Sequence, residues 1–351
     1  MEQGKMKAVI LKDTREFAVT EKPIPQIEKP DEIIVKVLVA SICGTDKGFA
    51  TNPDSKGYGD MRGRVLGHEL VGQIVDMGPE VKNFKIGDRI VVNPNSYCNV
   101  CPSCRAGHPN HCQNMELMGI THQGCFAEYV KTYERLAFPI SESVPLRHAV
   151  FAEPLSCAMN GFSRLDITPG DTCLVFGMGP IGLMFAQLAR RNGARVVCVE
   201  PMPKRIEVAQ KLGFTVFNPF ELDVAAIKAK LIEMWGRRAN YIIDAAGGQL
   251  PAAVDLAEYC GTILCFASPR VLKADTNLGP IQNKELKIMG SFVIHDSMPK
   301  AITVLENNYL DLDPIITHYL PLEEVGQGVE YMISGEGLEI VLNIGADAKE
   351  D

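Results

Sequence analysis

A glycine-rich turn between an apolar run and a helical run most restricts how this chain can fold. Thr172–Phe176 is a short apolar stretch, Gly177–Met178–Gly179–Pro180–Ile181–Gly182 follows it, and Leu183–Arg191 has helical periodicity. Arg195–Val199 is a second apolar run, which ends at Glu200. The order strand, glycine turn, helix, strand and acid predicts a βαβ unit, and such a unit requires a parallel sheet.

Each glycine of this turn has a physical reason if the turn binds a dinucleotide. Gly177 permits the tight turn, Gly179 lets the backbone approach a pyrophosphate, and Gly182 allows close helix–strand packing. The helix N-terminus then faces the phosphates. Glu200 would accept hydrogen bonds from the ribose hydroxyls and repel a 2′-phosphate, which favours NAD over NADP. Arg205 leaves NADP as an alternative cofactor, because a nearby cation pairs with such a phosphate.

The alternation of strands and helices continues after this unit. Helical patterns cover 204–212, 224–235 and 250–258, and apolar strand patterns cover 215–217, 241–244, 261–266 and 285–292. This alternation predicts an α/β fold with a doubly wound parallel sheet. Asp244 ends one of the strands, and two roles stay open for it: a place near the cofactor or the cap of the next helix.

The first part of the chain has a different pattern. Short β-branched and apolar runs at 7–11, 17–20, 32–40, 70–77 and 89–92 alternate with turns rich in glycine and proline. Residues 51–63 are polar and rich in glycine, so we expect a loop there. Many short strands with such punctuation predict an irregular β-rich domain.

This β-rich part contains residues of the kind that hold a catalytic zinc ion. Cys43–Gly44–Thr45–Asp46, Gly67–His68–Glu69 and the later Glu153 supply a thiolate, an imidazole and carboxylates. Three such ligands hold a catalytic zinc, and water or substrate takes the fourth position. Cys43 and His68 are 25 residues apart, so the tertiary fold must bring them together.

A second metal motif consists of Cys98, Cys101, Cys104 and Cys112. Thiolates in this C-x2-C-x2-C-x7-C pattern converge on a tetrahedral ion and favour a closed, structural zinc site. We expect this zinc to hold a lobe at residues 96–114. The alternatives are free surface thiols or, from the ligand type alone, an iron–sulfur cluster.

Charge and composition exclude several function classes. The net charge is −8, so no basic surface is expected for nucleic acid. No run of 18 apolar residues predicts a membrane span, and the polar N-terminus lacks a secretory signal. Eleven cysteines, four of them crowded together, suit metal binding in a reducing cytosol better than disulfides. We therefore expect a cytoplasmic protein whose partners are small molecules.

Taken together, these motifs resemble those of the zinc-dependent medium-chain dehydrogenases, in their polyol (sorbitol-type) and sugar branch. The similarity covers nearly the whole chain and includes Cys43–Asp46, Gly67–Glu69, Gly87–Arg89, Phe126–Tyr129 and Glu153–Leu155. The resemblance implies a GroES-like catalytic domain at 1–153 and 293–351 and a Rossmann NAD-binding domain at 154–292. It also implies a homodimer or homotetramer joined through the cofactor domains.

The same resemblance implies roles for individual residues. Cys43, His68 and Glu153 would bind the catalytic zinc, with Glu69 as an alternative or water-linked ligand. Asp46 would orient His68. Contacts to NAD would come from the glycine turn and from Pro180, Ile181, Glu200, Arg205, Phe266, Ala267, Ser268, Ser291, Phe292 and Val293.

The expected reaction passes a hydride from a secondary alcohol to NAD, and Thr45 would accept the hydroxyl proton. Many relatives continue the proton relay through a histidine where this chain has Gly48, so Glu69, Lys47 or water would carry the proton here. Phe49 replaces a tyrosine that sorbitol-type enzymes often place near the substrate, which makes sorbitol a doubtful substrate. The substrate is expected among polyols, sugars, aminocyclitols or sugar phosphates. The alternatives are a threonine-type amino-alcohol dehydrogenase and a catalytically silent NAD-binding relative.

Overall fold

The computed structural model describes residues 4–55, 57–267 and 276–348, and the chain separates into two compact units. The first unit comprises Met1–Ser156, Ile294–Tyr309 and Ile316–Asp351, and the second comprises Cys157–Val293 and Leu310–Ile315. The chain therefore first passes from the first unit to the second within helix α4 (Ala152–Phe162). The short segment 310–315, expected in the first unit, packs with the second instead.

The first unit is built on a sheet with the strand order β11-β7-β6-β3-β19-β18, in which β10 also pairs with β3. Its strands are β3 (Glu32–Ser41), β6 (Glu69–Met77), β7 (Arg89–Val92), β10 (Tyr129–Tyr133), β11 (Ala137–Pro139), β18 (Ile316–Pro321) and β19 (Glu339–Asn343). Strand β3 lies between β6 and β19 in this sheet, and eight of its ten residues are buried. The pairing of β3 with β19 joins the two ends of the chain.

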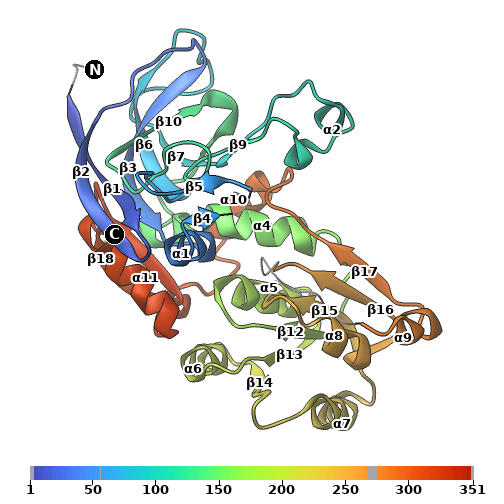
Figure 1. Ribbon diagram of the computed structural model, residues 1–351. Helices are drawn as coiled ribbons and strands as arrows, with labels where there is room; N and C mark the ends of the chain where they lie inside the picture. The colour runs from blue at the N-terminus through green and yellow to red at the C-terminus, as the bar shows by residue number, and fades with distance from the viewer. Residues whose placement is uncertain (1–3, 56, 268–275, 349–351) are drawn as a thin grey trace. The chain divides into compact units, whose positions relative to one another are not determined.

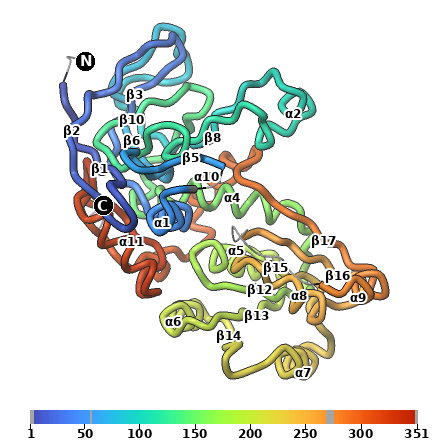
Figure 2. Tube along the Cα trace, in the orientation of Figure 1, coloured from blue at the N-terminus to red at the C-terminus, as the bar shows by residue number. Residues whose placement is uncertain are grey.

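The remaining elements of this unit lie outside this sheet. They are β1 (Lys5–Asp13), β2 (Glu16–Pro23), α1 (Gly44–Thr51), β4 (Asp54–Ser55), β5 (Gly59–Asp60), β8 (Asn95–Ser96), α2 (Pro102–Arg105), η1 (Pro109–His111), β9 (Glu116–Leu117), η2 (Glu134–Leu136), α3 (Leu146–Ala149), α10 (Met298–Glu306), η4 (Leu322–Glu324) and α11 (Val325–Ser334). Helix α11 packs beside α1 and β2, so late and early segments lie side by side (Figure 2).

The second unit is a parallel sheet with the order β14-β13-β12-β15-β16-β17 and helices packed against it (Figure 1). Its elements are β12 (Thr172–Phe176), α5 (Pro180–Arg191), β13 (Arg195–Val199), α6 (Pro203–Lys211), β14 (Thr215–Phe217), α7 (Val224–Trp235), β15 (Ala239–Asp244), α8 (Leu250–Leu256), β16 (Ala257–Cys265), α9 (Leu278–Asn283), β17 (Lys287–Gly290) and η3 (Asp313–Ile315). The strand order reverses direction between β12 and β15. Ligands of such sheets bind at this switch point, beside the carboxyl ends of the strands.

The expected fold class is confirmed, and the differences are local. Helix α1 forms where the sequence analysis predicts no helix, although its glycines and Thr45 have low helix propensity. Strand β18 has no strong strand signal and forms by pairing with β19. Helix α8 ends at Leu256, two residues earlier than predicted, because β16 begins at Ala257.

No helix in the described part of the chain combines the length and apolar character needed to cross a membrane.

Candidate active site and cofactor loop

Two neighbouring strands place the candidate metal ligands of the first unit. Strand β3 ends at Ser41, and Cys43 follows it as the N-cap of α1. Strand β6 begins at Glu69, which pairs with Ser41 in the antiparallel register, and His68 precedes it directly. The end of one strand and the start of the next therefore bring Cys43 and His68 together.

The donor atoms of Cys43, His68 and Glu69 lie within 4.8 Å of one another. A thiolate, an imidazole and a carboxylate are zinc ligands, so this donor set fits the ion that the sequence implies. The donor atom of Glu153, in the first turn of α4, lies outside this group. Glu153 is nevertheless buried and close enough for its charge to act on Cys43 and His68.

Asp46 ties the two ligand-bearing loops together. Its carboxylate accepts hydrogen bonds from the backbone N–H of Cys43 and of Gly67, each at 3.0 Å. The expected contact with the His68 ring is an ion-pair distance and not a hydrogen bond. His68 Nδ1 lies 3.9 Å from Asp46 Oδ1 and has no hydrogen-bond partner among the described residues. Asp46 thus acts on the loops through their backbone.

Burial and charge act on the ionisation of the ligand residues. Burial raises the pKa of the Cys43 thiol well above its ordinary value, and the charges of Glu69, Asp46 and Glu153 raise it further. Burial by itself lowers the pKa of His68, but the charges of Asp46, Glu153 and Glu69 outweigh it and raise that pKa. Metal ligation needs the thiolate and the neutral imidazole, so a divalent cation has to displace protons here.

The other predicted residues of this region lie on α1. Thr45 and Lys47 are half-buried, and the backbone N–H of Thr45 donates to the Cys43 sulfur. Phe49, expected near the substrate, is fully buried, and its ring packs edge-on against Tyr58 at 6.1 Å. Phe49 therefore belongs to the core of this unit.

The four cysteines of the lobe at residues 96–114 also converge. Their sulfur atoms lie within 4.8 Å of one another. Backbone N–H groups point at them: Cys98 donates to Cys112 at 3.3 Å, and Cys101 donates to Cys98 at 3.4 Å. Such donors stabilise thiolates, and those from Val100 and Cys101 lower the pKa of Cys98 to about 6. This arrangement fits a closed four-sulfur metal site.

In the second unit, the glycine turn follows β12 at the switch point of the sheet. Gly177 has a φ of +85°, which favours glycine, and its N–H donates to Val199 O. A Cβ at Gly182 would lie 1.7 Å from the carbonyl oxygen of Gly177. A Cβ at Gly179 would meet only the guanidinium of Arg205, at 3.8 Å, so this position is open toward a ligand. This cradle fits a dinucleotide.

Glu200 at the end of β13 shapes the same turn. Its carboxylate accepts hydrogen bonds from the N–H of Met178 at 2.6 Å and of Met202 at 2.9 Å. Arg205 lies beside it, with Nη1 4.0 Å from a Glu200 oxygen, and Arg205 Nε is buried without a hydrogen-bond partner among the described residues. A buried acid and a cation with a spare donor therefore flank the turn.

The other predicted cofactor contacts belong to nearby loops. Pro180 and Ile181 begin α5, and the N–H groups of Phe266 and Ala267 both donate to Asp244 O. Ser268 lies outside the described residues. Ser291 Oγ is buried without a described partner, and the carbonyl oxygens of Phe292 and Val293 accept from Asn160.

The carboxylate of Asp244 makes structural contacts with the backbone at the start of the next helix, which is one of the two roles left open for this residue. Its carboxylate accepts hydrogen bonds from the N–H groups of Ala246, Gly247 and Gln249, which lead into α8. Burial raises the pKa of Asp244, and these three bonds oppose that rise.

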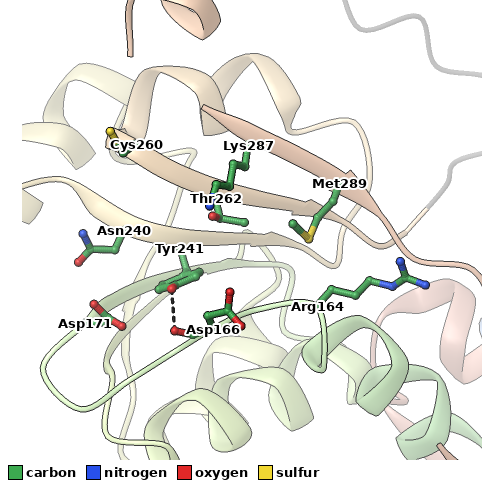
Figure 3. Close-up of a pocket in the computed structure, with 9 residues that line it drawn as sticks. All are labelled: Arg164, Asp166, Asp171, Asn240, Tyr241, Cys260, Thr262, Lys287 and Met289. Carbon is green, nitrogen blue, oxygen red and sulfur yellow. Dashed lines mark hydrogen bonds between the residues drawn. The ribbon is translucent and has the colours of Figure 1, made fainter. Parts of the chain in front are cut away.

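A separate polar pocket of about 210 Å³ lies at the opposite edge of this sheet (Figure 3). Tyr241, Thr262 and Lys287 line it from adjacent strands, and Tyr241 donates to Asp166 O at 2.8 Å. It lies near the beginnings of the strands, away from the glycine turn, so it is not part of the predicted cofactor site.

Sequence reasoning missed Ser41, whose buried hydroxyl donates to the carboxylate of Glu69. No local signal marks it, because a serine at the end of an apolar strand is unremarkable.

Comparisons with known proteins match both units. Residues 29–142 match the family model of the alcohol dehydrogenase GroES-like domain, and residues 180–307 match that of the zinc-binding dehydrogenases. The chain is 31% identical to D-arabinitol dehydrogenase 1 of Uromyces fabae, over 97% of each chain. It is also 31% identical to sorbitol dehydrogenase of Bacillus subtilis, over 93% of each chain. Its identity to L-threonine 3-dehydrogenase of Caldanaerobacter subterraneus is 33%, over 97% of this chain and 99% of that one.

Solved structures agree with these matches. A Sinorhizobium meliloti protein bound to NADP and described as a zinc-binding dehydrogenase superposes with a TM-score of 0.89 at 29% identity, over 97% of this chain and 100% of that one. A short-chain alcohol dehydrogenase of Escherichia coli complexed with NADH gives 0.87 at 28%, over 97% and 99%. The chain therefore belongs to the zinc-binding dehydrogenases that carry an alcohol dehydrogenase GroES-like domain.

Proposed function

We propose that the chain oxidises a secondary alcohol of a polyol, sugar, aminocyclitol or sugar phosphate with NAD. The observation that carries this proposal is the meeting of Cys43, His68 and Glu69 donor atoms in a chain that also has a dinucleotide turn. Relatives that act on D-arabinitol and sorbitol support the polyol class.

In this proposal the first unit is the catalytic domain and holds two zinc ions. Cys43, His68 and Glu153 would hold the catalytic ion, and Glu69 would be an alternative ligand, because its carboxylate already lies beside the thiol and the imidazole. Zinc, when bound, acts as a Lewis acid that lowers the pKa of the substrate hydroxyl. Cys98, Cys101, Cys104 and Cys112 hold the structural ion.

The residues of the chain then position the alcohol and remove its proton. Thr45 begins α1 beside Cys43, so its hydroxyl is assigned to the substrate oxygen and accepts the proton. Because Gly48 on the same helix cannot carry a proton, Glu69, Lys47 or water passes it on. NAD, when bound, would accept a hydride from the carbon that carries the hydroxyl, and the alcohol would become a carbonyl group.

The second unit binds the cofactor in this proposal. Glu200 lies buried beneath the turn, where it disfavours a 2′-phosphate, and this supports NAD. Arg205 supplies the spare donor that would let NADP bind more weakly. Structures of similar proteins hold NADP in one case and NADH in another, so coenzyme preference has to be measured.

The test is a substrate panel read at the nicotinamide absorbance, with polyols, sugars, aminocyclitols and sugar phosphates offered with NAD and with NADP. We expect NADH formation with at least one polyol-type secondary alcohol. Activity should require zinc, and Cys43→Ser should abolish it while the cofactor still binds. Full activity after removal of the catalytic zinc would refute the mechanism.

A second candidate is a threonine-type amino-alcohol dehydrogenase, favoured by the 33% identity to an L-threonine 3-dehydrogenase. Threonine in the same panel separates the two candidates, because only a threonine-type amino-alcohol dehydrogenase is expected to oxidise threonine. A catalytically silent relative would bind the cofactor and oxidise no member of the panel.

We further propose that copies of the chain associate through their cofactor domains as dimers or tetramers. Strand β17 is the last strand of its sheet, and its neighbourhood exposes Ile288 and Phe292, whose exposed fractions are 38% and 47%. Open strand edges with apolar side chains favour pairing with another chain. Light scattering of wild type and of Ile288→Lys tests this, since the variant should shift toward the monomer.

A further inference from the structure

The polar pocket of the second unit takes no part in the proposed function. Its volume of about 210 Å³ is below the roughly 300–1,000 Å³ of pockets that hold drug-sized ligands. Strand pairing sets three of its side chains in one row, because Tyr241 pairs with Thr262 and Thr262 pairs with Lys287. Residues of the segment 164–171, which follows α4, line the other side (Figure 3). The pocket therefore has room for a small polar ligand.

Three charged side chains of this pocket form no ion pair with a described residue: Arg164, Lys287 and Asp166. The backbone carbonyl of Asp166 accepts the hydroxyl of Tyr241, but its carboxylate accepts no hydrogen bond from the described residues. Lys287 extends from the strand side of the pocket, Asp166 lies on the other side, and Arg164 lies at one end (Figure 3). Charges of both signs are thus available to a ligand.

This distribution of charge indicates the chemical class of the ligand. A carboxylate would pair with Lys287 and Arg164, because ammonium and guanidinium groups both bind carboxylates. An ammonium group would pair with Asp166, and Thr262 and Asn240 offer hydrogen bonds to a polar side chain. A simple anion would leave Asp166 without a partner, and a simple cation would leave Lys287 and Arg164 without one. A free amino acid carries both charges and is small enough for the pocket.

Arg164 also connects the pocket to the segment that is proposed to contact NAD. Its guanidinium donates to Asn160 Oδ1 at 3.4 Å, a long hydrogen bond. Asn160 is buried, and its Nδ2 donates to the carbonyl oxygens of Phe292 at 3.2 Å and Val293 at 2.7 Å. Val293 has a φ of +43°, a conformation that β-branched residues rarely adopt. The amide of Asn160 therefore helps to hold a strained segment in place.

We propose that this pocket is an effector site for a free amino acid, whose carboxylate draws Arg164 away from Asn160 and thereby weakens cofactor binding. The effect on the cofactor rests on the proposed function, in which Phe292 and Val293 contact NAD. When Arg164 leaves, Asn160 loses the donor that orients its amide, and NAD has to order a looser segment. Because such coupling is reciprocal, the amino acid and the cofactor should weaken each other by the same factor.

The experiment is calorimetric titration of the full chain with L-alanine, L-asparagine and L-glutamine, each in the absence and in the presence of NADH. We expect at least one of them to bind and to weaken NADH about fivefold, with the same loss for the amino acid when NADH is present. The matched acids without an ammonium group are propionate, succinamate and glutaramate. The acid that matches the bound amino acid should bind about tenfold more weakly, because Asp166 then has no partner.

Four variants separate the site from its connection to the cofactor. Lys287→Met and Arg164→Met should each weaken the amino acid about tenfold. Asn160→Ala should still bind the amino acid but lose the mutual weakening, because the connection is broken. Arg237 is an exposed arginine of the same unit that does not line the pocket, so Arg237→Met should change neither quantity. Thermal melts establish that each variant is folded.

Three results would overturn the inference. Absence of binding by all three amino acids would remove the site, and equal binding of the matched acid would reduce it to a site for any anion. An amino acid that binds wild type without changing the affinity for NADH would remove the connection to the cofactor. Failure of the proposed function looks different, because then no alcohol of the substrate panel is oxidised, while the titration with amino acids gives the same answer.

Discussion

Replacement of Gly182 by alanine tests whether the glycine turn is as tightly packed as the structure indicates. A Cβ at this position would lie 1.7 Å from the carbonyl oxygen of Gly177 and 2.9 Å from its carbon. Such contacts need at least about 3 Å, so the start of α5 and the turn must separate by more than 1 Å. The contacted atoms belong to the backbone of Gly177, so rotation of a side chain cannot relieve the clash.

The expected cost follows from two opposing contributions. Overpacking of this kind costs about 3 kcal/mol at the upper end of its usual range. Alanine inside a helix returns about 1 kcal/mol relative to glycine. The net loss of about 2 kcal/mol should lower the melting temperature of the second unit by about 6 °C. The shifted turn should also weaken the binding of NADH at least tenfold.

The assay combines calorimetry without cofactor and titration of NADH fluorescence. Gly179→Ala is the control, because its Cβ would meet only Arg205 at 3.8 Å. Its change at the N-cap of α5 costs about 1 kcal/mol at most, yet it blocks the approach of a pyrophosphate. Gly182→Ala should thus affect stability and Gly179→Ala mainly affinity. A Gly182→Ala protein that melts like wild type would refute the reasoning.

Three further predictions follow from buried carboxylates. Asp46→Ala leaves the N–H groups of Cys43 and Gly67 without their acceptor, so it should cost about 2–4 kcal/mol in denaturant unfolding and reduce zinc content; Asp46→Asn, which keeps one acceptor oxygen, should fall between. Burial raises the pKa of Glu32, but backbone and Lys131 hydrogen bonds outweigh it and hold the pKa below the ordinary 4.5, so its stabilisation exists above that pH and is lost as pH falls through the lowered value. Glu32→Gln should therefore lower the melting temperature at pH 7 and have little effect below about pH 4, and a constant difference across pH would contradict this. Glu200→Ala should weaken the binding of NAD and relax discrimination against NADP in steady-state assays, whereas an unchanged coenzyme preference would exclude the assigned role.

Much of this fold is readable from the chain because its signals are local. The glycine turn, the helix after it and the acid at the end of β13 lie within thirty residues, so spacing alone predicts the βαβ unit. The four cysteines of the lobe are also close in sequence, and their sulfur atoms do converge. Short-range patterns of this kind are dictated by backbone geometry and need no knowledge of distant residues.

Other features depend on contacts between distant residues. Helix α1 forms against α11 despite weak propensity, and β18 forms by pairing with β19. The carboxylate of Asp46 binds the backbone N–H groups of Cys43 and Gly67, and the ring of Phe49 packs in the core of the first unit. In each case neighbours supplied by the fold, rather than the residue type, determine the contact.

The amino-acid sequence by itself determined which chemical groups the chain possesses and the local turns that present them. The tertiary structure alone decided that Ser41, the last residue of β3, donates its hydroxyl to the carboxylate of Glu69, 28 residues away in the chain. The physical reason is that the antiparallel pairing of β3 with β6 sets Ser41 opposite Glu69. No pattern near Ser41 marks a partner that only the sheet brings within hydrogen-bonding distance.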